Sequence, residues 1–293
     1  MLGTFVVLYL LLGGCGAAVL GLAALWSLLF SRTCTRTGAQ SRAFALLRAR
    51  LFLVSFAILV LAALCLLLDL GRPARVLLLF VRPTTSLISL GTFVLAACLV
   101  LSAFLAAANM LDSMRVSSRI RKVAEVLSLI PAVVMLVYTG LYMAWMEAVP
   151  LWNNPALPWL LAASSLSSGV ALIMLIAPFS RDWKLLTGWL DALRRMHQMI
   201  LVVELVALIA FCILAAMSPF AVVFLADLFD PIALGPWFVV GFIVLGLVLP
   251  LAAEFLVKSL RGSAGPKLAE VLCISGGLIL RFCLVLAGSH WLG

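Results

Sequence analysis

The sequence predicts an all-α integral membrane protein with eight transmembrane helices in two four-helix bundles. Of the 293 residues, 66% are hydrophobic and only 11% are charged, whereas soluble domains carry roughly 45–50% and about 25%. The apolar residues gather in eight long runs, and the basic residues gather between alternate runs. We expect residues 1–148 to form the first bundle and residues 149–293 the second.

A membrane helix needs about 20 mostly apolar residues. The runs are rich in Leu, Ala, Val and Ile and do not alternate with polar residues, which excludes a transmembrane β-barrel. The eight runs are 4–30, 51–69, 86–109, 123–146, 157–178, 197–217, 235–257 and 268–289. The first run is too long for a signal-peptide core and has no basic residue before it, so we expect an uncleaved first helix.

Sixteen of the 20 lysines and arginines lie in four alternate connections. These connections are 31–50, 110–122, 179–196 and 258–267. Alternate connections share one face of the membrane, and the face rich in basic residues is normally cytoplasmic, so both termini are expected outside. Arg72, Arg75 and Arg82 are exceptions on the outer face. The net charge of +9 therefore reflects membrane topology and gives no support to nucleic-acid binding.

Several cofactor classes lack the residues that they need. No two of the seven cysteines have CxxC spacing, which argues against an iron–sulfur cluster. The two histidines, His197 and His290, are separated by about one bilayer thickness, roughly 30 Å, which argues against a haem held between them. Neither a GxxxxGKS nor a GxGxxG motif is present, so nucleotide binding has no support.

Polar and aromatic residues gather at the outer ends of the first four helices. They are Tyr9, Asp69, Ser89, Tyr138, Tyr142, Trp145 and Glu147. The spacing of Tyr138, Tyr142 and Trp145 places them on one helix face. This pattern is compatible with a pocket for a flat ring that carries two carbonyl groups. The alternative is an ordinary interfacial belt of aromatic residues, with Asp69 pairing locally with Arg72.

The second half places Glu204, Glu254 and Arg281 within apolar runs. Ionisable residues inside a membrane are rare and commonly functional, so one interpretation is a proton path. The alternatives are a structural ion pair and, for Glu254, a side chain that extends toward the membrane surface.

Several segments together resemble the polysulfide reductase membrane-subunit family, also called NrfD/PsrC. The segments are Tyr9–Gly14 (YLLLGG), Asp69–Pro73 (DLGRP), Tyr138–Leu141 (YTGL), Leu151–Pro158 (LWNNPALP) and Gly276–Arg281 (GGLILR). The resemblance extends over nearly the whole chain, and the DLGRP and YTG elements are its most specific parts.

The resemblance implies an eight-helix, haem-free subunit of a respiratory complex in the cytoplasmic membrane of a bacterium or archaeon. Such a subunit exchanges electrons between menaquinol or ubiquinol and a four-cluster ferredoxin-like iron–sulfur subunit. That partner connects to a catalytic subunit, often a molybdopterin enzyme. The subunit itself holds no metal or iron–sulfur cluster. Tyr138 matches the tyrosine of the quinone pocket, Asp69 and Arg72 match the DLGRP motif, and Arg281 matches the last helix.

Without haem, electrons must pass directly between the quinone and the partner, so the pocket must lie at the surface that the partner covers. We expect Tyr138 to bind a quinone oxygen, Asp69 and Glu147 to handle the proton, and Arg72 to hold the acid or a partner carboxylate. Arg72, Arg75 and Arg82 would then contact an acidic partner surface.

Two other functions remain open from the sequence. A secondary transporter would be favoured by inverted repeats and by broken helices in corresponding halves, and no clear internal repeat is visible. A structural anchor with a degenerate quinone site is the other alternative, because the first helix contains neither His nor Asn.

Overall fold

The computed structural model describes residues 4–33, 37–69, 87–111, 116–146, 149–180, 182–256 and 265–289. These residues form helices and no strand. The helices are α1 (Thr4–Arg32), α2 (Gly38–Asp69), α4 (Leu87–Met110), α5 (Ser118–Ala144), α6 (Leu157–Ile176), η1 (Ala177–Phe179), η2 (Trp183–Leu186), α7 (Thr187–Met217), α8 (Ala221–Phe229), η3 (Pro236–Val248), α9 (Leu249–Leu256) and α10 (Gly265–Ser289). The all-α prediction is confirmed for the described part of the chain.

Eight helical segments in the described ranges are long and apolar enough to cross a membrane. Each contains most of one predicted apolar run, so the chain is a multi-pass integral membrane protein. The seventh segment, Pro236–Ala253, combines η3 with the start of α9. The η3 segment is a π-helix, which has a wider turn than an α-helix. The cytoplasmic assignment of the basic connections stays a prediction.

Helices α2 and α7 extend well beyond their apolar runs on the basic side, which corrects the predicted loop boundaries there. The predicted connection 31–50 is mostly helical, and Arg42, Arg48 and Arg50 lie on α2. At 1.5 Å per residue, the 32 residues of α2 measure about 48 Å, against a hydrocarbon core of roughly 30 Å. An apolar run marks only the part inside the hydrocarbon, whereas Ala, Leu and Arg continue a helix readily beyond it.

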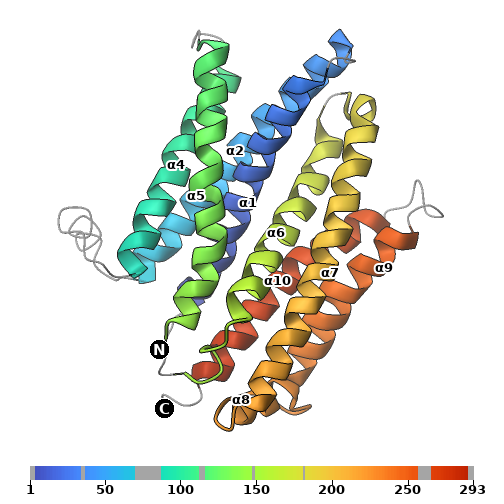
Figure 1. Cartoon of the computed structure of the whole chain (residues 1–293). Helices are drawn as coiled ribbons and strands as arrows, with labels where there is room; N and C mark the ends of the chain where they lie inside the picture. Colours follow the sequence, from blue (N-terminus) through green and yellow to red (C-terminus); the bar gives the residue numbers. More distant parts are fainter. Residues whose placement is uncertain are drawn as a thin grey trace.

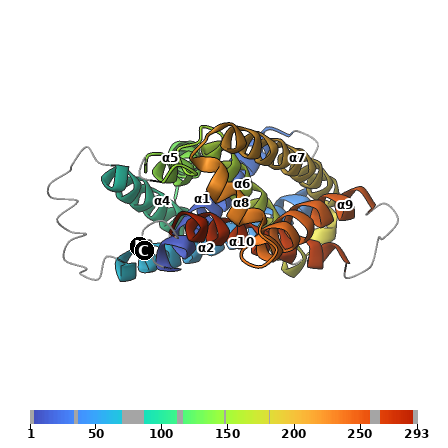
Figure 2. The same cartoon turned by 90° about the horizontal axis from the view of Figure 1, so that it is seen from below.

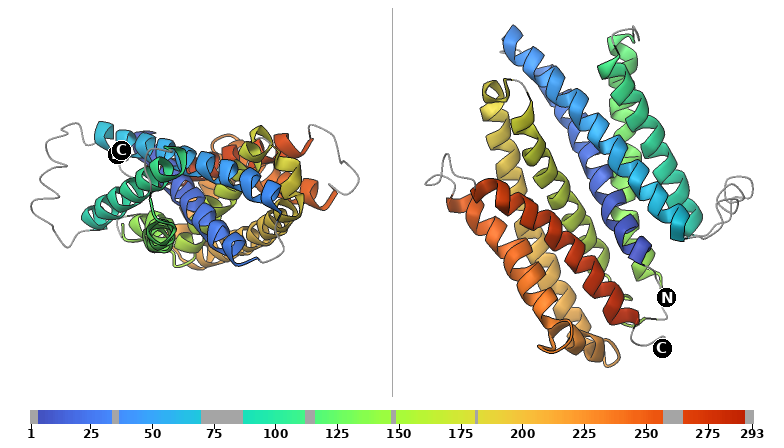
Figure 3. Two further views of the ribbon diagram at one scale, coloured as in Figure 1. Left: turned by 90° about the horizontal axis from the view of Figure 1, so that it is seen from above. Right: turned by 180° about the vertical axis from the view of Figure 1, so that it is seen from behind.

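The helices divide into two neighbouring groups (Figure 1). Helices α1, α2, α4 and α5 contact one another, and so do α6, α7, η3, α9 and α10. The groups meet where α1 contacts α6 and α10 and where α5 contacts α6. The view from below shows α1, α6 and α10 near the middle of an elongated molecule (Figure 2), and the view from behind shows α10 beside α1 (Figure 3). The domain boundary at residues 148 and 149 stays a prediction.

Small residues allow these central helices to approach closely. A Cβ on Gly14 of α1 would lie 2.9 Å from the Cβ of Ser165 on α6. A Cβ on Gly140 of α5 would lie 2.9 Å from the carbonyl oxygen of Pro158 at the start of α6. Membrane helices associate through such small-residue surfaces because their backbones can then come into contact. The packing places α1 and α6 at the junction between the two groups.

Candidate functional site

The three tyrosines of the chain form a cluster in the first group of helices. Tyr9 of α1 and Tyr138 of α5 are each only 3% exposed, and their side chains are hydrogen-bonded to each other. The ring of Tyr142 lies one turn further along α5, with its centroid 6.0 Å from that of Tyr138. The structure therefore brings together three of the residues that the sequence suggested for a pocket.

Gly91 of α4 forms the surface against which the Tyr138 ring lies. A Cβ on Gly91 would lie 2.5 Å from Cε1 of Tyr138 and closer still to its Cζ and hydroxyl oxygen. Because carbon atoms in contact are normally about 3.5–4.0 Å apart, the ring occupies space that only glycine leaves. Sequence reasoning missed Gly91, although a glycine inside an apolar run can indicate a close approach. Ser89, a predicted pocket residue, is also buried on α4.

Asp69 is the last residue of α2 and is exposed. It lies close enough to Tyr142 for its charge to act on that tyrosine. Trp145 lies just beyond the end of α5 and is 74% exposed, as is usual for an aromatic residue in an interfacial belt, so it does not join the buried tyrosines. Four further predicted residues lie outside the described residues: Arg72, Arg75, Arg82 and Glu147.

This arrangement provides hydroxyl groups in an apolar surrounding, with a carboxylate nearby at the membrane surface. A phenol hydroxyl can donate a hydrogen bond to a carbonyl oxygen and accept one from a hydroxyl group. A carboxylate that is exposed to solvent can exchange protons with water. The cluster can therefore bind an oxygen of a neutral ring compound and connect it to a proton acceptor.

A second polar centre surrounds Arg281 of α10, whose side chain is fully buried. Its guanidinium group donates to the hydroxyl oxygen of Ser165 at 2.6 Å and to the carbonyl oxygen of Gly277 at 2.7 Å. Longer hydrogen bonds of 3.4 Å reach the hydroxyl oxygen of Ser164 and the carbonyl oxygen of Leu161. The charge is thus surrounded by oxygen atoms of α6 and α10, as a charge in a membrane interior requires.

Glu204 of α7 belongs to the same polar centre. Its carboxylate accepts a 2.7 Å hydrogen bond from the hydroxyl of Ser167 and a further one from Ser164, and it interacts electrostatically with Arg281. Ser164 therefore contacts both charged groups. The structure joins two of the three residues that the sequence suggested for a proton path. The third, Glu254, has its backbone in α9, but its side chain lies outside the described residues.

Two side chains that sequence reasoning left unassigned lie in the same group of helices. His197 of α7 is 1% exposed, and its Nε2 atom lies 3.7 Å from the Sγ atom of Cys273 on α10. His197 also interacts electrostatically with Glu204. Glu270, one turn before Cys273, is 6% exposed. The sequence spacing shows that these residues share helix faces with Glu204 and Arg281, but not that the two faces meet.

A third polar cluster was also missed by sequence reasoning. Glu125 of α5 is 2% exposed and lies 3.5 Å from the guanidinium group of Arg48 on α2. The hydroxyl of Ser27 on α1 donates to Glu125 at 2.8 Å and accepts from Arg48 at 2.9 Å. This cluster joins three helices of the first group, and its composition is that of a structural ion pair.

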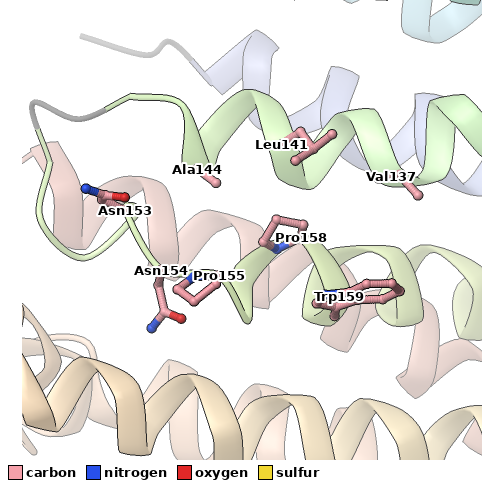
Figure 4. A pocket seen from close by; sticks show the side chains of 8 residues that line it. All are labelled: Val137, Leu141, Ala144, Asn153, Asn154, Pro155, Pro158 and Trp159. Carbon is pink, nitrogen blue, oxygen red and sulfur yellow. The ribbon is translucent and has the colours of Figure 1, made fainter.

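A groove of about 350 Å³ runs between α5 and the start of α6 (Figure 4). Its lining residues are Val137, Leu141, Ala144, Asn153, Asn154, Pro155, Pro158 and Trp159. Trp159 is 70% exposed and Leu141 is 41% exposed, so the groove opens toward the surroundings of the helices. Its lining contains none of the tyrosines, which makes it distinct from the buried cluster.

Within the ranges that the structure describes, no group of three or more His, Cys, Asp or Glu side chains could hold a metal ion.

Comparison with known proteins gives the family. The model of the family described as "Polysulphide reductase, NrfD" matches residues 1–293. "Protein NrfD" of Escherichia coli (strain K12) is 28% identical over 170 residues, which cover 56% of this chain and 52% of that protein. The match thus spans about half the length of this curated relative. Because the family model matches the full sequence, the chain belongs to the polysulphide reductase NrfD family.

Proposed function

We propose that this chain is the quinone-reactive, haem-free membrane subunit of its complex, which exchanges electrons between menaquinone or ubiquinone and a partner iron–sulfur subunit. The observation that carries the proposal is the buried, hydrogen-bonded pair Tyr9–Tyr138, with Tyr142 and Asp69 leading from it toward the surface. A few polar groups that converge in an apolar surrounding are typical of a site for a small, mostly apolar molecule.

The roles of the residues follow from their positions. The Tyr138 hydroxyl binds one quinone oxygen, and Tyr9 orients that hydroxyl through their hydrogen bond. Oxidation of a quinol releases two electrons and two protons. The electrons go to the partner, and a proton goes by way of Tyr142 to Asp69, with Glu147 as a second acceptor. Ser89 and Trp145 complete the predicted pocket, with Trp145 at its rim.

The partner is a four-cluster ferredoxin-like subunit, which connects to a catalytic subunit of the molybdopterin class. Arg72, Arg75 and Arg82 would contact an acidic surface of the iron–sulfur subunit, and Arg72 would alternatively hold the acid of the pocket. The membrane is the cytoplasmic membrane of a bacterium or archaeon. If the partner docks beside the tyrosine cluster, its nearest iron–sulfur cluster would lie within electron-transfer distance of the quinone.

The second group of helices carries a proton path through Glu204, Arg281 and Glu254. The contacts of Ser164 with both Glu204 and Arg281 support this part of the proposal. A membrane-buried charge that is also hydrogen-bonded to mobile hydroxyl groups is a common feature of proton-conducting sites.

Replacing Tyr138 with Phe tests the quinone site, because it removes one hydroxyl and keeps the ring against Gly91. Loss of a hydrogen bond to the reacting oxygen should lower quinol oxidation by the purified complex at least about tenfold, which corresponds to roughly 1.4 kcal/mol of barrier. Trp159→Phe, in the separate groove, is the control for general damage to the outer end. Unchanged quinol oxidation by an assembled Tyr138→Phe complex would refute the proposed site.

A further inference from the structure

The buried face of α10 carries a line of groups that can bind or release protons. Glu270, Cys273 and Arg281 are 6%, 3% and 0% exposed, and with Gly277 they recur every three or four residues, so they lie on one side of the helix. From Glu270 to Arg281 the helix rises about 16 Å, which is roughly half of the hydrocarbon thickness. The line therefore reaches from one end of the span toward its middle.

Helix α7 places its own buried ionisable groups against this line. His197 and Glu204 are 1% and 3% exposed and are two turns apart on one face of the helix. His197 meets the α10 line at Cys273, and Glu204 meets it near Arg281. Glu270 lies one turn before Cys273 on α10, so it is about one turn from the level of His197.

Helix α6 contributes hydroxyl groups at the Arg281 end of this line. Ser167 donates to Glu204 at 2.7 Å, while Ser164 and Ser165 both contact Arg281. Cys15 of α1 also lies near Arg281. The groups that face the Glu204 carboxylate are thus Arg281 from α10, hydroxyls from α6 and, further along its own helix, His197.

Burial of a carboxyl group and an imidazole inside a membrane helix bundle is costly unless each has partners. Apolar residues of similar volume would commonly stabilise the fold as well or better. Imidazole is the side chain that gains and loses a proton most readily near neutral pH. The line is therefore better explained by proton transfer than by packing.

We propose that His197 and Glu270 form the entrance of the proton path on the basic, cytoplasmic side, and that His197 passes protons from Glu270 to Glu204. This inference rests on the proposed proton path through Glu204 and Arg281, and it assigns the residues at the entrance of that path. A proton from water binds the Glu270 carboxylate, moves to the His197 imidazole, and then moves to the Glu204 carboxylate, without any change of redox state. His197 and Glu204 are about 10 Å apart along α7, so this step requires bridging water molecules.

The inference can be tested on the intact complex reconstituted in liposomes, where quinol oxidation and proton uptake are measured in the same sample. His197→Ala should reduce proton uptake at least about tenfold while the assembled complex retains most of its quinol oxidation. Added imidazole should restore much of the uptake, because it can occupy the space left by the side chain. Glu270→Gln should also reduce uptake, without a response to imidazole.

Met199→Ala is the matched control, because Met199 lies half a turn from His197 on α7 but is 63% exposed, and its proton uptake should stay normal. His197→Gln keeps most of the volume and separates loss of the proton carrier from loss of folding. Normal proton uptake by either His197 variant would refute the proposed entrance. Failure of imidazole to restore proton uptake in His197→Ala would refute it as well. Quinol oxidation without proton uptake in the unmodified complex would instead overturn the proposed proton path itself.

Discussion

Gly91→Ala should abolish most of the quinol chemistry by adding a single methyl group. The new Cβ would lie 2.5 Å from Cε1 of Tyr138 and nearer still to its Cζ and hydroxyl oxygen. To restore an ordinary contact of about 3.5–4.0 Å, the ring must move by roughly 1 Å or more. Tyr138 is only 3% exposed, so the movement must displace neighbouring residues. It must also break or distort the hydrogen bond to Tyr9.

The cost follows from these contacts. Overpacking a well-packed interior costs about 1–3 kcal/mol, and a lost hydrogen bond adds about 0.5–1.5 kcal/mol. A protein of ordinary stability remains folded after losing this much of its free energy of unfolding. A displacement of about 1 Å at a reacting group can lower a rate by about a hundredfold. Gly91→Ala should therefore assemble with its partners and lose roughly tenfold to a hundredfold in quinol oxidation.

Quinol oxidation by the purified complex, with the amount of assembled complex measured in parallel, checks this prediction. Gly188→Ala is the control, because a Cβ there meets no described atom within 4 Å, and it should behave as the unmodified protein. Gly91→Ala and Tyr138→Phe should not be additive, since both act on one ring. Full activity of assembled Gly91→Ala, or a simple product of the two effects in the double variant, would refute the reasoning.

Two further predictions concern stability. Glu125→Ala leaves the partly buried Arg48 without its partner carboxylate and should lower the free energy of unfolding by up to about 3–5 kcal/mol, measured as a fall in the melting temperature of the detergent-solubilised protein. Leu127→Ala, at a 51% exposed position on the same helix, should have little effect. Trp152→Phe removes a 2.8 Å hydrogen bond to a carbonyl of α10 and should cost about 1 kcal/mol, so a stability equal to that of the unmodified protein would contradict the role of that bond.

The eight spans could be predicted because a backbone inside a bilayer must satisfy its own hydrogen bonds, which leaves long apolar runs no alternative to helices. The helix ends could not be predicted in the same way. The segment of α2 from Gly38 to Arg50 is helical, but its charges made it resemble a loop. Apolar content reports the position of the hydrocarbon and not the length of the helix.

The candidate site was only partly predictable for a related reason. Tyr9 and Tyr138 could be expected near one membrane face, but their hydrogen bond depends on how α1 and α5 are rotated. Gly91 and the pair Arg48–Glu125 were missed because their roles depend on contacts with a neighbouring helix. Periodicity shows which residues of one helix share a face, and it does not show which other helix that face meets.

The surroundings of Arg281 have a consequence for how the protein is made. An arginine at the middle of an isolated membrane helix costs about 2.5–3.5 kcal/mol at the insertion machinery. Ribosomes complete α6 and α7 before α10, so the hydroxyl groups of α6 and the carboxylate of Glu204 are already in the membrane when Arg281 arrives. The earlier helices thus provide polar partners for Arg281 before α10 is inserted. Correct insertion of α10, a late step of biogenesis, therefore depends on those helices.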